Sequence, residues 1–152
     1  MNTPTNVRSR LRFDGLDHEV TPDGSGMVSV RLEWGGQTYE GSVSCLETPQ
    51  GVIKAASQAT LTATLASAGP EGSNGLNLEV VGVKAVRAFD GWVVVTRING
   101  RSGNEKLRLL GAAPCESEEE LPDAAVKAVL NASNRVMEQQ IARDYSGNGQ
   151  TP

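Results

Sequence analysis

The first half of the chain contains a segment in which apolar and polar residues alternate with the period of two typical of a half-buried strand. The apolar positions of its clearest stretch are Val28, Val30, Leu32 and Trp34. Gly35-Gly36 follows as a two-residue turn signal, and the alternation resumes over residues 38–45. This segment therefore predicts a β-hairpin.

A shorter alternation precedes the hairpin. Arg8, Arg10 and Arg12 fall on one side of residues 8–13, with Leu11 and Phe13 on the other side. This stretch predicts a strand whose basic side either docks an acidic partner or is simply exposed to solvent. The polar stretch that follows, residues 14–19, contains the only histidine, His18, and is typical of a loop.

An alanine-rich helix is predicted next. Thr48 supplies an N-cap hydroxyl and Pro49 suits the first turn, so a helix is expected over residues 50–68. Gly69-Pro70 is expected to end it. The helix consists largely of Ala, Ser and Thr, and such a helix can lie close against a sheet.

The same order of elements then recurs. Strands are predicted over residues 76–89, 92–98 and 106–110, with Asn99-Gly100 as the hairpin signal. Three glutamates followed by Pro122 then predict a helix that runs to about Ala142. The expected domain organisation is a first repeat over residues 8–68 and a second repeat over residues 76–143, joined by a linker over residues 69–75. Flexible tails are expected over residues 1–7 and 144–152.

An internal duplication explains this recurrence. The two helices align without gaps, and the identical pairs are Ala55 with Ala124, Ala56 with Ala125, Ala59 with Ala128, Leu61 with Leu130 and Ala63 with Ala132. Gly41 precedes Cys45 by the same interval by which Gly111 precedes Cys115. Trp34-Gly35-Gly36 is expected to correspond to Ile98-Asn99-Gly100. The sequence therefore predicts an α+β fold of tandem duplicated βββα units, with antiparallel sheets packed against two alanine-rich helices around one core.

Composition and charge exclude several classes of function. The chain has 152 residues, a formal net charge of -4 and a sequence pI of about 5.0, so no general attraction to nucleic acid or to an anionic membrane is expected. No apolar run is long enough to span a bilayer and no signal peptide is evident, and we therefore expect a cytoplasmic protein.

The residues that carry chemistry are few. With a single histidine and two distant cysteines, Cys45 and Cys115, the spacing suggests no catalytic group, no metal site and no cofactor, and free thiols are expected because a cytoplasmic context disfavours a disulfide. The run of glutamates before the second helix is expected to compensate the helix dipole. The candidate ligand-binding residues are Thr48, Gln50 and Gly51, whose helix N-terminus either holds an anion or is only capped by Thr48.

Two known families share features of the chain. The second helix reads Asp123-Ala124-Ala125-Val126-Lys127-Ala128-Val129-Leu130-Asn131-Ala132-Ser133-Asn134-Arg135. A tandem βββα pair with such a helix resembles the C-terminal allosteric domain of 2-isopropylmalate synthase, over roughly residues 8–143. The resemblance implies a module that dimerises and binds a small metabolite such as an amino acid. Since the catalytic barrel of that family has no counterpart here, it implies no condensation chemistry.

The second resemblance concerns RNA. The segment Trp34-Gly35-Gly36-Gln37-Thr38-Tyr39-Glu40-Gly41, followed by an alanine-rich helix, is similar to the later half of a double-stranded RNA-binding domain. Such domains use lysines at a helix N-terminus to reach phosphates, and here the first helix start offers only Lys54. The leading hypothesis is therefore a non-catalytic regulatory or assembly module that forms a homodimer and binds a small metabolite. The alternative is a structural or adaptor protein that docks a larger protein partner, and RNA binding is the least favoured.

Overall fold

The structure, a computed structural model, describes residues 11–72 and 76–149 and consists of two three-stranded antiparallel sheets and two long helices. The first sheet has the order β1 (Arg12–Val20), β2 (Gly26–Trp34) and β3 (Gln37–Cys45), followed by α1 (Pro49–Gly72). The second sheet has the order β4 (Leu76–Ala88), β5 (Gly91–Ser102) and β6 (Glu105–Cys115), followed by the short 3-10 helix η2 (Glu118–Glu120) and α2 (Leu121–Gly149). The α+β fold with a repeated βββα arrangement is thus confirmed.

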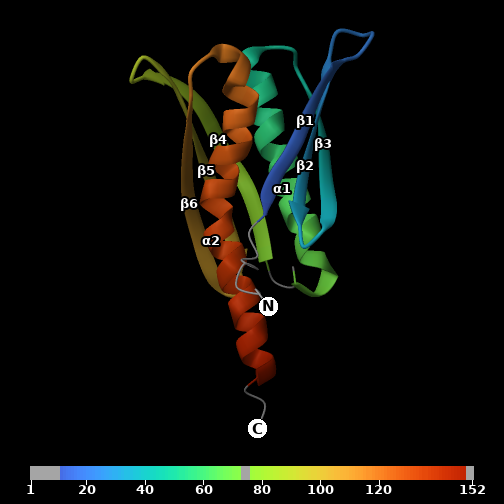
Figure 1. The fold of residues 1–152 in the computed structure, drawn as a ribbon, viewed down its shortest axis with the longest axis vertical. Coiled ribbons are helices and arrows are strands. Elements are labelled where there is room, and N and C mark those ends of the chain that lie inside the picture. The colour runs from blue at the N-terminus through green and yellow to red at the C-terminus, as the bar shows by residue number, and fades with distance from the viewer. Residues whose placement is uncertain (1–10, 73–75, 150–152) are drawn as a thin grey trace.

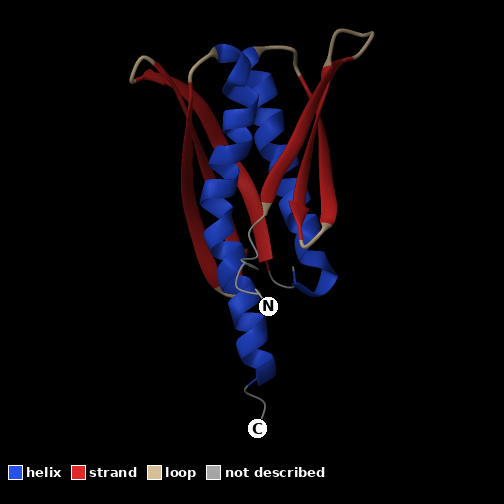
Figure 2. Cartoon of the chain, in the orientation of Figure 1, coloured by secondary structure: helices blue, strands red, loops and turns tan. Residues whose placement is uncertain are grey.

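The two helices lie side by side in the middle of the molecule, with one sheet on each flank (Figures 1 and 2). Each helix packs on the second and third strands of its own sheet, and α1 also contacts β4 of the other repeat. Both helices begin at the end of the molecule that carries the β1–β2 and β4–β5 turns (Figure 1). Within the described residues, no helix is long and apolar enough to cross a membrane.

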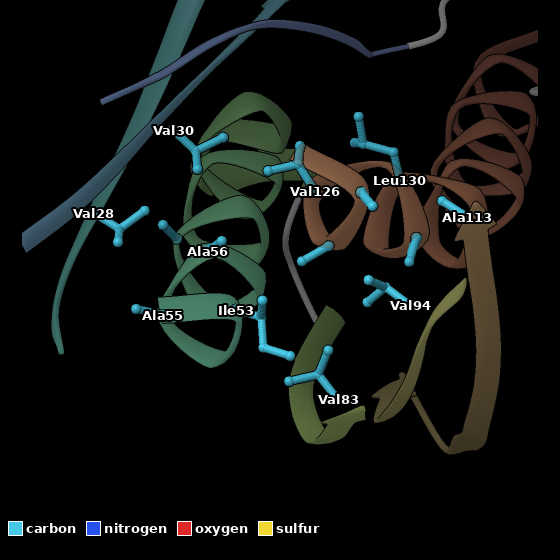
Figure 3. Close-up of a cluster of buried hydrophobic side chains, with 14 of the residues drawn as sticks. Val28, Val30, Ile53, Ala55, Ala56, Val83, Val94, Ala113, Val126 and Leu130 are labelled. Atoms are coloured by element: carbon cyan, nitrogen blue, oxygen red, sulfur yellow. The ribbon is translucent and has the colours of Figure 1, made fainter. Parts of the chain in front are cut away.

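One hydrophobic core joins the two repeats (Figure 3). The sheets contribute mainly valines to it, and the helices contribute mainly alanines. Its members include Val28, Val30, Ala55, Ala56, Val83, Val94, Ala125, Val126 and Ala128. Since neither sheet alone could bury its inner face, the shared core makes each repeat depend on the other for stability.

Buried hydroxyl groups accompany the alanines along α1. The hydroxyls of Ser57, Thr60 and Thr64 each donate to the carbonyl oxygen four residues earlier, at 2.9, 2.7 and 2.8 Å. Because a buried hydroxyl without a partner costs free energy, these bonds allow polar residues to lie within a tightly packed helix.

The strand register extends the duplication beyond the helices. In both repeats the first strand bulges just before a glycine, between Phe13 and Gly15 in β1 and between Val80 and Gly82 in β4. Val28 pairs with His18 and Val43, and the corresponding Val94 pairs with Ala85 and Ala113. The register therefore gives each position of the first sheet a counterpart in the second.

Corresponding glycines on β3 and β6 allow each helix to approach its sheet closely. A Cβ atom on Gly41 would lie 2.2 Å from the carbonyl oxygen of Ala59, and one on Gly111 would lie 2.0 Å from that of Ala128. Ala59 and Ala128 are also counterparts in the helix alignment. The same contact between strand and helix backbone is thus built twice, and only glycine fits at either strand position.

Three details of the sequence prediction are wrong. Residues 14–19 belong to β1 and form no loop, because Leu16 and His18 lie on the inner side of the strand, opposite Val30 and Val28, while the polar residues between them face outward. The alternation on this edge strand is obscured by the bulge after Phe13.

Asn99 and Gly100 lie within β5, and the hairpin turn follows Ser102, which pairs with Glu105. Trp34 consequently corresponds to Gly100 and not to Ile98. A Cβ atom on Gly100 would lie 2.1 Å from the carbonyl oxygen of Asn77 on β4, so this glycine serves a close approach within the sheet and not a turn.

Both helices are also longer than predicted. α1 continues through Gly69-Pro70 to Gly72, so the proline lies in the last turn of the helix and does not end it. α2 continues past Ala142 to Gly149. The expected N-terminal tail, residues 1–7, lies outside the described residues, as do Arg8 and Arg10 of the predicted basic strand and residues 73–75 and 150–152.

Substitution of Gly41 or Gly111 by alanine is expected to destabilise the protein by about 1–3 kcal/mol, because the new methyl group would force the helix away from the sheet. Chemical denaturation would measure the change. Gly82→Ala is the matched control, since nothing lies within 4 Å of its added Cβ. Equal stability of the Gly41, Gly111 and Gly82 variants would contradict the close-approach argument.

Candidate functional site

Three side chains of different chemistry converge at the end of the first repeat where α1 begins. His18 lies on β1, Cys45 ends β3, and Glu47 lies in the link between β3 and α1. One ligand atom of each residue lies within 4.8 Å of the ligand atoms of the other two. We call this group the His–Cys–Glu cluster.

A glycine on the central strand makes this convergence possible. Gly26 pairs with Val20 of β1 and with Cys45 of β3, and without a side chain it leaves space on the face of the sheet between these two strands. A Cβ atom there would lie 1.7 Å from the Glu47 Oε2 atom and 3.0 Å from the Cys45 Sγ atom. The carboxylate therefore occupies the space that any other residue at position 26 would fill.

The Glu47 carboxylate is the centre of the cluster. Its Oε2 atom lies 2.7 Å from His18 Nε2 and accepts the Cys45 thiol at 3.6 Å. The His18 and Glu47 side chains are 32% and 23% exposed, so water reaches both of them. Burial raises the pKa of the Cys45 thiol, and the neighbouring Glu47 carboxylate raises it further. A thiolate at this position consequently needs a positive charge beside it.

This arrangement does not suit a cysteine nucleophile. An activated cysteine needs a base or a cation that holds its sulfur as a thiolate. Here the thiol donates to the Glu47 carboxylate and not to His18, whose ligand atom lies within 4.8 Å, and the pKa of the thiol is raised. The three donor types, imidazole nitrogen, thiol sulfur and carboxylate oxygen, are those that zinc accepts in proteins. The geometry is thus better suited to holding a cation than to covalent catalysis.

The corresponding end of the second repeat carries an open cavity of about 720 Å³. It lies between the β4–β5 turn, the end of β6 and the start of α2. The residues that give it chemical character are Phe89, Trp92, Cys115, Glu116, Asp123 and Lys127. Two aromatic rings, several carboxylates and one ammonium group suit a ligand with an apolar part and a positive charge.

The turn at the rim of this cavity is strained. Phe89 and Asp90 have φ angles of 55° and 60°, a region that side chains other than Gly, Asn and Asp seldom adopt. Phe89 is also 95% exposed. An exposed aromatic residue in an unfavourable backbone conformation has no evident benefit for folding, and it marks this turn as a candidate for binding.

The sequence-predicted ligand residues form the N-terminus of α1. The Thr48 hydroxyl accepts the Gly51 N–H at 2.9 Å, and the Gln50 amide donates to the Val83 carbonyl oxygen of β4 at 2.9 Å. A Cβ atom on Gly51 would lie 2.4 Å from the Leu46 carbonyl oxygen. Thr48 therefore caps its helix and Gln50 joins the two repeats, while an anion-binding role for these residues stays a prediction.

The glutamates before α2 act as expected of a helix start. The Glu120 carboxylate accepts the N–H groups of Glu116 and Ser117 at 3.0 and 3.1 Å. These hydrogen bonds hold the pKa of Glu120 below its usual value. The carboxylate is thus engaged in capping the chain that leads into α2.

The outer faces of the two sheets differ in polarity. Five positions that face away from the helices are polar in the first sheet and apolar in the second, whereas Lys84 and Arg97 keep charged residues on the same face of the second sheet. The counterpart pairs are Glu19 with Val86, Ser29 with Val95, Glu40 with Leu110, Ser42 with Ala112 and Ser44 with Pro114. Together with Val93, these apolar residues form a surface that we call the apolar face, on which Leu110 is 72% exposed.

No protein-family model matches the chain, and no curated protein matches it. The site must therefore be judged on its geometry alone.

Sequence reasoning missed the His–Cys–Glu cluster because it assigned His18 to a loop. The signal that could have found it is the duplication itself, since aligning Gly15 with Gly82 places His18 opposite Ala85 in a strand. Cys45 and Cys115 are both free, as predicted, and the structure places each at the end of its third strand.

Substitution of Phe89 by asparagine is expected to stabilise the protein by about 1 kcal/mol, because asparagine adopts a positive φ angle at lower cost. Thermal or chemical unfolding would measure the change. Phe89→Leu is the control that keeps the unfavourable conformation and should leave stability nearly unchanged. A loss of stability in the asparagine variant would mean that the ring itself supports the fold.

Proposed function

We propose that the protein is a non-catalytic assembly module that pairs with a second copy of itself through the apolar face of the second sheet. The observation that carries the proposal is the contrast between counterpart positions of the two sheets. Both sheets use the same fold and register, so the fold itself does not require apolar residues on an outer face.

The apolar face is costly to leave in water. Val86 and Leu110 are 41% and 72% exposed, and Val93 and Val95 lie between them on β5 in the strand register. Lys84 and Arg97 lie opposite Val95 and Leu110 on the same surface, so the exposed apolar residues are bordered by charged ones. An exposed apolar patch with polar residues around it is typical of a protein–protein interface. The first sheet shows the solvent-adapted version of the same surface, where Ser29 and Ser42 hydrogen-bond to each other at 2.8 Å.

A second copy suits the distribution of charge. Beyond the apolar face, the other end of the same sheet surface is basic. Arg101 on β5 lies directly opposite Lys106 on β6, and Arg108 is the next β6 residue on this face. Like charges that lie opposite each other do not stabilise a sheet. Two copies related by a twofold axis through the apolar face would overlap their apolar residues and point their basic ends in opposite directions.

The resemblance to the allosteric domain of 2-isopropylmalate synthase supports the same proposal, since that duplicated module mediates dimerisation. The proposed absence of catalysis rests on the chemistry at the His–Cys–Glu cluster, where the Cys45 thiol donates to the Glu47 carboxylate and not to the His18 imidazole. A docking surface for a larger protein is the competing function, and it would use the same face without self-association.

The oligomeric state tests the proposal. Analytical ultracentrifugation of the full chain is expected to show a dimer. The triple variant Val95→Ser, Leu110→Glu and Ala112→Ser should be a monomer with an unchanged fold, because it carries the residues that the first sheet has at these positions.

Ser44→Glu, on the outer face of β3, is the matched control and should remain a dimer. A wild-type chain that is monomeric at every accessible concentration would refute the proposal and favour the adaptor function. A triple variant that still dimerises would place the interface elsewhere and would refute it equally.

A second candidate function is the binding of a small zwitterionic metabolite in the cavity beside Phe89. The cavity volume of about 720 Å³ lies within the range of small-molecule sites, and its lining offers Asp123 and Glu116 to an ammonium group and Lys127 to a carboxylate. This arrangement favours an amino acid with an apolar side chain.

Thermal shift measurements against the amino acids are expected to show stabilisation by at least one of them, by about 2.7 kcal/mol at a hundredfold excess over its dissociation constant. Asp123→Asn should weaken the effect, and Glu118→Gln, outside the cavity lining, should leave it intact. If no amino acid stabilises the protein at millimolar concentration, this second function is excluded.

A further inference from the structure

We infer that His18, Cys45 and Glu47 form a zinc-binding site at the end of the first repeat. The inference goes beyond the proposed function, because neither self-association nor metabolite binding requires a metal. It rests on the donor atoms, on the space that Gly26 leaves for them, and on the comparison with the second repeat.

The donor atoms are of the right kind and almost at the right separation. Imidazole nitrogen, thiolate sulfur and carboxylate oxygen are the three ligand types of protein zinc sites. Ligand atoms around a tetrahedral zinc ion are about 3.3–3.8 Å apart, given bond lengths of about 2.0–2.3 Å. The sulfur of Cys45 lies 3.6 Å from Glu47 Oε2, His18 Nε2 lies 2.7 Å from the same oxygen, and all three donor atoms lie within 4.8 Å of one another. Side-chain adjustments of about 1 Å would bring them around one ion.

The three ligands come from separate parts of the first repeat. They belong to an edge strand, to the end of the opposite edge strand, and to the link that leads into α1. Gly26 keeps the space between them free of side chains, since a Cβ atom at this position would lie only 1.7 Å from the Glu47 carboxylate. A bound ion would therefore join both edges of the sheet to the start of the helix.

The second repeat provides an internal comparison. It keeps the cysteine, as Cys115, but the strand register places Ala85 where the first repeat has His18 and Trp92 where it has Gly26. The duplicated scaffold therefore needs neither the histidine nor the glycine to fold. Only the first repeat combines this histidine and this glycine with a cysteine and a glutamate. The combination points to a function that the first repeat alone has.

Three protein ligands leave one position of a four-coordinate zinc ion open, and the cluster is exposed enough for water to fill it. The His18 and Glu47 side chains are 32% and 23% exposed, so a water molecule can complete a four-coordinate site. Binding would release the proton of the Cys45 thiol, because the thiolate is the ligand form. The Cys45 sulfur and the Glu47 carboxylate, which now contact each other, would then both contact the cation.

Cobalt(II) titration of the full-length chain, followed by absorption spectroscopy, tests the site. The expected result is one ion per chain, with a thiolate-to-cobalt charge-transfer band and the visible bands of tetrahedral cobalt, all displaced by zinc. Cys45→Ser should remove the charge-transfer band. Cys115→Ser is the matched control at the counterpart position and should retain both the band and the stoichiometry.

His18→Ala and Glu47→Gln should each weaken zinc binding by at least about tenfold, measured by competition with a chromophoric chelator. Circular dichroism of each variant would establish that it is folded. Should Cys45→Ser fail to fold, thiol alkylation of the wild-type chain supplies the second measurement, because zinc should then protect Cys45 and leave Cys115 reactive.

Three results would overturn the inference. They are the absence of stoichiometric metal binding, a charge-transfer band that survives in Cys45→Ser, and equal protection of both cysteines by zinc. Gly26→Ala gives a further check, because a methyl group there would occupy the space of the Glu47 carboxylate and should weaken binding as strongly as Glu47→Gln.

Discussion

The structure depends on a close contact between a helix backbone and the third strand of its sheet, made once in each repeat. Gly41 faces the carbonyl oxygen of Ala59, and Gly111 faces that of Ala128, in spaces too small for a methyl group. Because the helices come so near the sheets, alanine is large enough to fill the interior. This explains how a chain with only 4% aromatic residues builds a core from alanine together with valine, leucine and isoleucine.

This contact also decides which surfaces remain free. The helix pair is covered by a sheet on each flank, so each sheet has one face on the core and one face on solvent (Figure 2). The outer faces take no part in the helix–strand contact and can therefore change without loss of the fold. Ser29 and Val95 occupy the same place in the two repeats and illustrate this freedom. Residues on the outer faces can therefore differ between the repeats without changing the packing of the core, and such a difference is consistent with a new interface.

The sequence was sufficient for the architecture but not for the site. Alternation predicted the strand around Val30, a short continuous apolar run predicted the strand around Val94, and the repeated alanines predicted two similar helices, because these signals are local. Prediction failed at residues 14–19, where a bulge shifts the alternation. It also failed at Asn99-Gly100, a pair typical of a hairpin turn, because this glycine is needed for the close approach to Asn77 within the sheet. The His–Cys–Glu cluster could not be inferred from spacing, because three strands must first pair in register before His18 reaches Glu47.

Topology accounts for the position of the candidate sites. A three-strand meander followed by a helix brings the first turn and the link into the helix to the same end of each repeat, and both repeats point this end the same way, on opposite flanks of the helix pair (Figure 1). The turns and links at this end lie beyond the Gly41 and Gly111 contacts, so substitutions in them do not disturb the close packing of helix and sheet. The first repeat has placed a histidine, a cysteine and a glutamate at this end, and the second has placed an aromatic cavity there. Two copies of one fold can in this way acquire different binding chemistry while each continues to stabilise the other through the shared core.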